Sequence, residues 1–258
     1  MHIPIIFSFA RSGGTLVNQL LGAHPDCMIL SEVNPAGSVI SVAKQASQWL
    51  ELLKEEEAEQ FKELPYSEQI VMLNERAKVK NKTLIIRDWV TANYLSGAGG
   101  QSVTPSYNLE QFTYLVRSGY SLQPLVVTRK AYQVYCSIKR SFSQLANLSE
   151  EDFLTSYLAY AHAVNAFPKV SLERLQSAPQ ETLRSILNSQ TLSTGYIDRQ
   201  LESFADYHKC TGNNTLTKPV ATSHLRKIVP VVSDSLADNN SANKAAFAKA
   251  DRLLGYEA

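Results

Sequence analysis

The sequence predicts an α/β fold in which helices cover both faces of a central parallel sheet, a three-layer α/β/α arrangement. Short apolar runs alternate along the chain with longer stretches whose apolar residues recur at helical spacing. Strands that are separated by helices favour parallel pairing within a sheet that is covered on both faces. The length of 258 residues suffices for one sizeable domain of this class, and we expect residues 1–258 to form it.

The expected strands are short apolar runs with longer amphipathic stretches between them. In chain order they lie at residues 5–8, 28–30, 84–86, 125–127 and 169–171. Helices are expected at residues 15–23, near residue 109, directly after the fourth strand, and at about 150–166. The first helix is indicated by Leu16, Val17, Leu20 and Leu21, which share one face. Residues 51–63 are rich in Glu and Lys, and we interpret them as a solvated helix face rather than an acidic docking patch.

Composition and charge exclude several classes of function. The formal net charge is +1, so no global field favours nucleic acid or an anionic membrane, and any anion site must come from a local cluster. The three cysteines are scattered without metal-ligand spacing, which favours reduced thiols over a disulfide framework or a zinc site. No apolar run approaches the length of a membrane span, and the N-terminus lacks the features of a signal peptide. We therefore expect a cytoplasmic protein.

The strongest motif is the glycine-containing loop FSFARSGGTL at residues 7–16, which lies between the first strand and the first helix. Glycines let the backbone turn tightly and approach a ligand closely. The helix that follows offers unpaired N–H groups and the positive end of its dipole, which together suit a phosphate. The loop predicts a P-loop-like nucleotide site, although glycine-rich turns alone are common between strands and helices.

The loop departs from the Walker pattern GxxxxGK[ST] in an informative way. Ser8 stands where the first Gly should be, Gly13 fits the second, and Thr15 fits the last position. Gly14 replaces the essential Lys, while Arg11 supplies a cation inside the loop. These departures disfavour hydrolysis of ATP or GTP and leave binding of a 5′-phosphate group as the expectation.

A second anion site is indicated at the fourth strand. Arg129 follows the strand directly, at the carboxyl end where open α/β sheets bind ligands. Ser137 comes eight residues later, in the second turn of the next helix, and can face the same crevice. An Arg clamps phosphate through two N–H groups, and a Ser adds a short hydrogen bond. With the first loop, this pair predicts a nucleotide that has phosphate at two separate positions.

With these motifs the chain resembles the sulfotransferases that use 3′-phosphoadenosine 5′-phosphosulfate (PAPS), and it is most similar to the tyrosylprotein and bacterial branches. The matching segments are Arg11-Ser12-Gly13-Gly14-Thr15-Leu16, Ala23-His24-Pro25-Asp26, Arg129 with Ser137, Val170-Ser171-Leu172-Glu173-Arg174-Leu175, Pro179, Leu183, and Leu253-Leu254-Gly255-Tyr256. The resemblance implies that the 5′-phosphosulfate binds the first loop and the 3′-phosphate binds Arg129 and Ser137. It implies PAPS as the sulfuryl donor, with no metal.

The chain also departs from the family. The family often has Thr where Gly14 stands and usually has Tyr where Leu172 stands. The C-terminal lid that closes over the nucleotide is poorly matched, and Ser223 and Arg226 are the best candidates for it.

The resemblance also implies catalytic roles. Glu32 matches the catalytic Glu of the tyrosylprotein branch and is our candidate for the general base; the alternative is a cap for a helix that begins near Pro35. Arg11 would hold the bridging and sulfuryl oxygens. Arg87 would be a second cation for the transition state, with Asp88 as its orienting partner; the alternative is a simple surface ion pair.

Three histidines are further candidates for a base. His24 lies inside the turn motif, which favours a structural role, and neither His162 nor His224 has a matching context.

The leading function is transfer of a sulfuryl group from PAPS to a hydroxyl or amine of an unidentified sugar, lipid, peptide or small metabolite. One rival is a P-loop kinase-like phosphotransferase, which the missing Walker Lys disfavours. The other is a sulfotransferase-like domain that binds a nucleotide or a partner without turnover, which Gly14 and the weak lid leave open. The acceptor surface is expected from the helices within residues 51–80 and the loop at 97–106.

Overall fold

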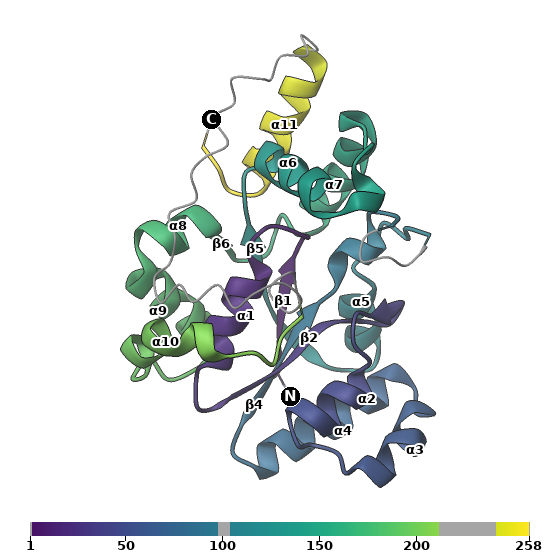
Figure 1. Ribbon diagram of the computed structural model, residues 1–258, viewed down its shortest axis with the longest axis vertical. Helices are drawn as coiled ribbons and strands as arrows, with labels where there is room; N and C mark the ends of the chain where they lie inside the picture. Colours follow the sequence, from purple (N-terminus) through teal and green to yellow (C-terminus); the bar gives the residue numbers. More distant parts are fainter. Residues whose placement is uncertain (1, 98–103, 212–240, 258) are drawn as a thin grey trace.

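The computed structural model describes residues 2–97, 104–211 and 241–257, and it contains one mixed sheet with helices on both faces (Figure 1). The sheet order is β3-β2-β4-β1-β5-β6. Its strands are β1 (His2–Ser8), β2 (Cys27–Asn34), β3 (Gly37–Ser38), β4 (Thr83–Asp88), β5 (Ser121–Thr128) and β6 (Lys169–Ser171). The predicted α/β class is confirmed, and each expected strand is present, extended by a few residues in most cases.

One part of the sheet differs from the prediction of a purely parallel sheet. The pairs β1–β4, β1–β5, β2–β4 and β5–β6 are parallel, but β2 and β3 pair in antiparallel register, with Val33 opposite Ser38. The short turn after Asn34 returns the chain beside β2 before any helix begins. The helix expected near Pro35 is therefore absent; the next helix starts at Val42, and its cap is the Ser41 side chain.

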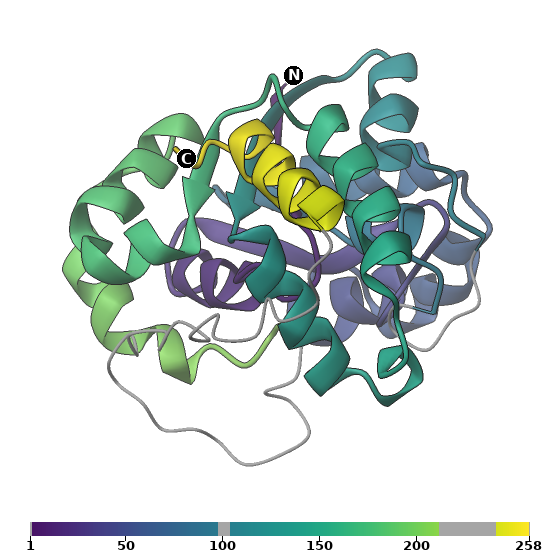
Figure 2. The same cartoon turned by 90° about the horizontal axis from the view of Figure 1, so that it is seen from above.

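The helices divide into two layers. One layer lies on one face of the sheet and contains α1 (Gly14–Gly22), α8 (Leu172–Ser177), α9 (Pro179–Ser189) and α10 (Ile197–Ser203). The other face carries α2 (Val42–Lys44), α3 (Ala58–Lys62), α4 (Tyr66–Val79), α5 (Glu110–Arg117), α6 (Ala131–Ser141), α7 (Glu150–Ala163) and α11 (Ser241–Leu253). Seen from above, the sheet lies between α8–α10 in green and α2–α4 in blue (Figure 2).

Short helical segments complete these layers. They are η1 (Gln45–Trp49, a π-helix), η2 (Glu55–Glu57), η3 (Val90–Asn93), η5 (Ser143–Leu145) and η6 (Phe204–Asp206).

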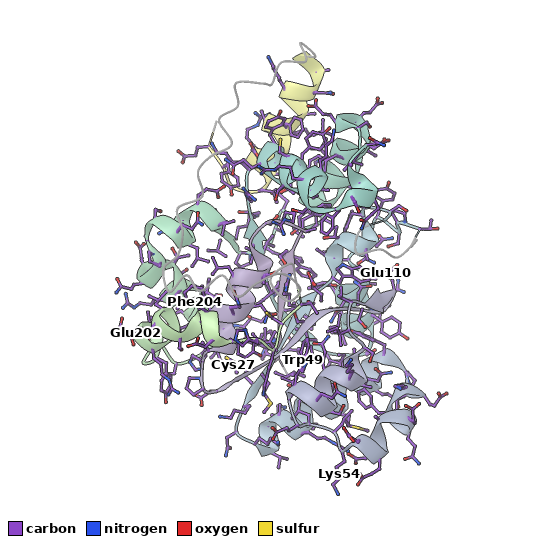
Figure 3. The ribbon with its side chains drawn as sticks, viewed as in Figure 1. Cys27, Trp49, Lys54, Glu110, Glu202 and Phe204 are labelled. Atoms are coloured by element: carbon purple, nitrogen blue, oxygen red, sulfur yellow. The ribbon has the colours of Figure 1, made fainter. Side chains whose placement is uncertain are left out.

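Two apolar clusters form the core, one on each face of the sheet. The alternation of strand residues explains this division, because successive side chains point to opposite faces. In β4, Ile85 packs with α1 and α9, whereas Ile86 packs on the other face. Figure 3 shows Cys27 and Phe204, both buried, in the interior near α1, and the exposed charged side chains of Lys54 and Glu202 at the periphery. Residues 55–62, with their exposed Glu and Lys, form η2 and α3, in agreement with the predicted solvated helix face.

None of the helices within the described residues is long and apolar enough to cross a membrane.

Candidate nucleotide and transfer site

The loop between β1 and α1 is held in an unusual backbone conformation. Arg11 has a φ of 69° and Gly13 a φ of 98°, both in the left-handed region. The turn closes through a hydrogen bond from the Ser12 N–H to the Phe9 carbonyl, 3.0 Å, and η3 supports it through Thr91, whose hydroxyl accepts from the Ala10 N–H at 2.7 Å. A non-glycine residue in this region costs free energy, so the strain at Arg11 is typical of a functional loop.

Helix α1 begins at Gly14 without a side-chain cap. Its first N–H groups have no partner within the helix, and together with the helix dipole they favour an anion at this end. The hydroxyl of Thr15 also lies here, within 3.5 Å of Arg87 Nη2. Leu16, the last residue of the motif, packs on the apolar cluster beside α1.

The two predicted anion sites meet in the folded chain. Arg11 Nε donates to the hydroxyl of Ser137 in α6 at 3.0 Å. Arg129 Nη1 donates to the carbonyl of Arg11 at 3.1 Å, and the Tyr157 hydroxyl donates to the carbonyl of Arg129 at 3.2 Å. Arg129 and Ser137 are both buried. The loop, the end of β5 and the second turn of α6 therefore form one polar cluster.

Three arginines, Arg11, Arg129 and Arg140, concentrate positive charge in this cluster. Burial lowers the pKa of Arg11, and the nearby charges of Arg129 and Arg140 lower it further. Burial is also the main cause that lowers the pKa of Arg129, with Arg140 contributing, whereas the charge of Glu173 acts in the opposite direction. Among the described residues, neither Arg11 nor Arg129 forms an ion pair with a carboxylate. A bound anion would offset both the burial and the mutual repulsion of these guanidinium groups.

Arg87 and Glu32 form a second polar cluster beside the same helix. Arg87 Nη2 lies 2.7 Å from Glu32 Oε1, with side-chain exposures of 5% and 18%. Arg87 Nη1 donates to the Ser31 hydroxyl at 3.3 Å and to the Thr211 carbonyl at 3.2 Å. This is a largely buried ion pair at the ends of two adjacent strands, which differs from the alternative of a simple surface pair.

Glu32 stands at an irregularity in the sheet. The register of β2 against β4 shifts between Ser31 and Val33, and Glu32 has a φ of 51°. A β-bulge of this kind re-aims one side chain, and bulges are frequent next to active sites. Gln45 in η1 stabilises the bulge, because its side-chain amide accepts from the Ser31 N–H at 2.7 Å and donates to the Ser31 carbonyl at 2.9 Å. The alternative reading of Glu32 as a helix cap is wrong, because no helix begins near Pro35.

Asp88 is not the partner of Arg87, contrary to the sequence prediction. Adjacent residues of a strand point to opposite faces, so Asp88 lies with the core on the far side of the sheet. There its Oδ1 accepts from Asn34 Nδ2 at 2.7 Å, and Asn34 Nδ2 also donates to Asn93 Oδ1 at 2.8 Å. Burial is the main cause that raises the pKa of Asp88 to about 8. Glu32, and not Asp88, orients Arg87.

The remaining candidates fall in different places. His24 is buried, and its two ring nitrogens bond to the Ser193 carbonyl at 2.9 Å and to the Asp26 N–H at 3.0 Å, which agrees with a structural role. His162 is exposed on α7. The lid candidates Ser223 and Arg226, and His224, lie outside the described residues. No group of His, Cys, Asp or Glu within the described residues has the arrangement of a metal site.

Sequence reasoning missed two residues of the second cluster, Ser31 and Thr211. The Ser31 hydroxyl lies 2.8 Å from Thr211 Oγ1 and accepts from the Thr211 N–H at 3.0 Å. Nearby in the chain, the ring of Tyr207 packs on Gly22, where a Cβ would lie 2.2 Å from the ring. Neither residue stands in a recognisable motif, so no signal in the sequence could have found them. Arg140 was visible after Ser137 but was not assigned a role.

Comparison with solved structures identifies the fold of the chain. The sequence matches no protein-family model and no curated protein. The structure resembles the sulfotransferase domain from the curacin biosynthetic pathway, with a TM-score of 0.60 and 16% identity, over 99% of this chain and 98% of that chain. It also resembles the sulfotransferase domain from the Synechococcus PCC 7002 olefin synthase, with a TM-score of 0.50 and 15% identity, over 100% and 96% of the two chains. The chain has the fold of these sulfotransferase domains.

Proposed function

We propose that this protein is a sulfotransferase that moves a sulfuryl group from PAPS to a hydroxyl or amine of an acceptor. The observation that supports this most directly is the contact of Arg11 with both Ser137 and Arg129. Two cationic groups from separate motifs, the half-buried Arg11 and the buried Arg129, converge on one place, and neither has an ion-pair partner among the described residues. A donor that carries phosphate at both its 3′ and 5′ positions fits such a pair of adjoining sites.

In this proposal the nucleotide binds along the carboxyl ends of β1 and β5. The 5′-phosphosulfate accepts hydrogen bonds from the first N–H groups of α1 and from Thr15. The 3′-phosphate accepts from Arg129 and Ser137, and Arg140 adds charge at the same place. Arg11 lies between the two phosphate positions, where its guanidinium can donate hydrogen bonds to either group.

The transfer step requires a base, an in-line approach and fixed positive charge. In the proposed step, Glu32 removes the proton of the acceptor hydroxyl while the acceptor oxygen forms a bond to sulfur. The bond from sulfur to the 5′-phosphate oxygen breaks, and 3′-phosphoadenosine 5′-phosphate (PAP) leaves with the negative charge. Among the described residues, Arg87 bonds to Glu32 through Oε1, and in the proposed step Oε2 accepts the proton. The same guanidinium faces Thr15, so it is suited to stabilise charge on the transferring group.

The direct test is transfer of ³⁵S from labelled PAPS by the purified full chain to a panel of sugars, lipids, peptides and small metabolites, and then to an extract of the native cell. Calorimetry with PAP, and separately with ATP and Mg²⁺, distinguishes the sulfotransferase from a kinase-like phosphotransferase. Tight binding of PAP with label transfer supports the proposal. Binding of PAP without transfer to any acceptor would favour a non-catalytic binding domain, and preference for ATP with Mg²⁺ would contradict the proposal.

A further inference from the structure

The backbone conformation of Gly14 does not require a glycine, but its surroundings do. It begins α1 and does not have a positive φ, so its conformation is open to any residue. A Cβ at this position would lie 2.1 Å from Ser8 Oγ and 2.8 Å from Ser8 Cβ. Both distances are too short for any real contact, and Ser8 has little freedom to move. The side chain of Ser8 therefore occupies the space that a side chain at residue 14 would need.

The position of Ser8 is fixed by the sheet. Ser8 is the last residue of β1, opposite Val127 of β5, and its exposed fraction is only 6%. Its side chain lies on the α1 face of the sheet, the same face as that of Ile6. A serine hydroxyl at this point lies directly beside the first turn of α1, where the unpaired N–H groups begin.

Arg87 approaches the same space from β4. The Cβ position of Gly14 is 3.0 Å from Arg87 Nε, and that buried N–H has no hydrogen-bond partner among the described residues. Arg87 itself is 4% exposed, so its unpaired donor is a costly feature unless a ligand satisfies it. The hydroxyl of Ser8, the start of α1 and the unpaired donor of Arg87 thus lie next to one another.

We propose that the Ser8 hydroxyl binds an oxygen of the 5′-phosphosulfate, in the place where the resembling family has a Thr hydroxyl at residue 14. The hydroxyl comes from the end of β1 rather than from α1, and Gly14 is the residue that makes room for it. Ser8 and Gly14 form a matched pair in which each residue depends on the identity of the other. This inference rests on the proposed function for the identity of the ligand. The steric pairing of Ser8 with Gly14 does not depend on that function.

The steric part is tested by stability alone. Gly14→Ala should lower the melting temperature of the protein, because the new methyl group collides with Ser8. The same substitution in a Ser8→Gly background should have a much smaller effect, since the obstructing side chain is gone. Equal effects in the two backgrounds would overturn the pairing, whatever the protein binds.

The binding part is tested with PAP and labelled PAPS. Ser8→Ala should weaken PAP binding about tenfold or more, as expected for loss of one hydrogen bond to a charged group, with little change in melting temperature. Ser47→Ala in η1 serves as the control, because the Ser47 hydroxyl donates to the carbonyls of Ala43 and Lys44 in the preceding turn. Gly14→Thr alone should lose PAP binding, and the double variant Ser8→Gly with Gly14→Thr should recover it to within about tenfold of the wild type.

The outcomes separate this inference from the proposed function. Wild-type affinity for PAP in Ser8→Ala, or a double variant no better than Gly14→Thr, would overturn the role of Ser8 and leave the sulfotransferase proposal standing. A wild-type protein that does not bind PAP at all would instead overturn the proposed function, and with it the identity of the ligand at Ser8.

Discussion

Arg11 and Ser137 are 126 positions apart in the chain, yet Arg11 Nε donates to the Ser137 hydroxyl at 3.0 Å. The bond joins the loop after β1 to the helix after β5, two adjacent parallel strands whose carboxyl ends meet at the same edge of the sheet. Ligands of open α/β sheets bind at this edge. The contact therefore brings together the two predicted anion-binding motifs, which are remote in the sequence.

The first prediction concerns the two phosphates of the nucleotide. PAP should bind at least about tenfold more tightly than AMP, because the 3′-phosphate adds charged hydrogen bonds. Ser137→Ala should reduce this preference and leave the affinity for AMP nearly unchanged. Isothermal calorimetry measures both affinities, and Ser141→Ala, one turn later on α6, is the matched control. Equal affinities of the wild type for PAP and AMP would remove the case for Arg129 and Ser137 as the 3′-phosphate site.

Arg11 is predicted to serve binding and transfer together. Its half-buried guanidinium lies beside Arg129, where a bound anion would offset the repulsion between the two charges. Arg11→Ala should therefore weaken PAP by about tenfold or more and lower turnover as well. The loss of affinity should be larger at low salt, because screening weakens the attraction in the wild type. An Arg11→Ala variant with unchanged PAP affinity would show that the anion lies elsewhere; Arg174→Ala, which removes an exposed arginine, is the control.

Most of the sheet could be predicted from the sequence because β1, β2, β4 and β5 each contain a compact apolar run. Strand β3 could not, because its two residues pair with β2 only after the turn at Asn34 forms. Helices α8 and α10 have only 6 and 7 residues, which gives little periodicity to detect, whereas the 11 residues of α9 have an amphipathic pattern that could have been found.

The site was predicted where a motif is contiguous and missed where it depends on tertiary structure. Glu32 could be proposed as the base from its distance to Arg11 along the chain, and this role stays a prediction, whereas its pairing with Arg87 arises only from the register of β2 and β4. The error at Asp88 was avoidable, because the period of two in a strand already places Arg87 and Asp88 on opposite faces. Thr211 could not be found, since it reaches Ser31 across 180 positions of the chain.

Glu32 is predicted to act on the acceptor and not on the nucleotide. Glu32→Gln preserves the size of the side chain and an oxygen for Arg87 but cannot accept a proton. Turnover should fall by about 10²–10⁴ if proton transfer contributes to the rate-limiting step, while PAP affinity stays within about twofold. The comparison requires ³⁵S transfer to a confirmed acceptor, with PAP calorimetry on the same preparation.

The matched control is Glu57→Gln, which alters another Glu–Arg pair at 2.7 Å, between Glu57 and Arg76. It should leave both turnover and PAP affinity unchanged. Full activity of Glu32→Gln would place the base elsewhere, and His162 or His224 would be tested next.

Asp88 is predicted to make the stability of the protein depend on pH. Burial raises its pKa to about 8 in the folded protein, against an ordinary value of 3.8. Between these two pH values the unfolded chain has lost the proton that the folded protein retains. The free energy of unfolding therefore falls as the pH rises from about 4 to about 8, and it is then constant with respect to this group. Other titratable groups that interact with Asp88 are Tyr66, Tyr94, Glu110 and Tyr160.

Asp88→Asn removes this titration and preserves the oxygen that accepts from Asn34. The melting temperature of the variant, relative to the wild type, should rise steadily between pH 5 and pH 8. A gain of only about 1 kcal/mol over this range corresponds to roughly 2–4 °C for a chain of this size. Asp198→Asn, an exposed position on α10, should show no such trend. If the difference in melting temperature between Asp88→Asn and the wild type is the same at every pH, Asp88 is ionised throughout this range. The carboxylate would then be stabilised by more than its hydrogen bond with Asn34.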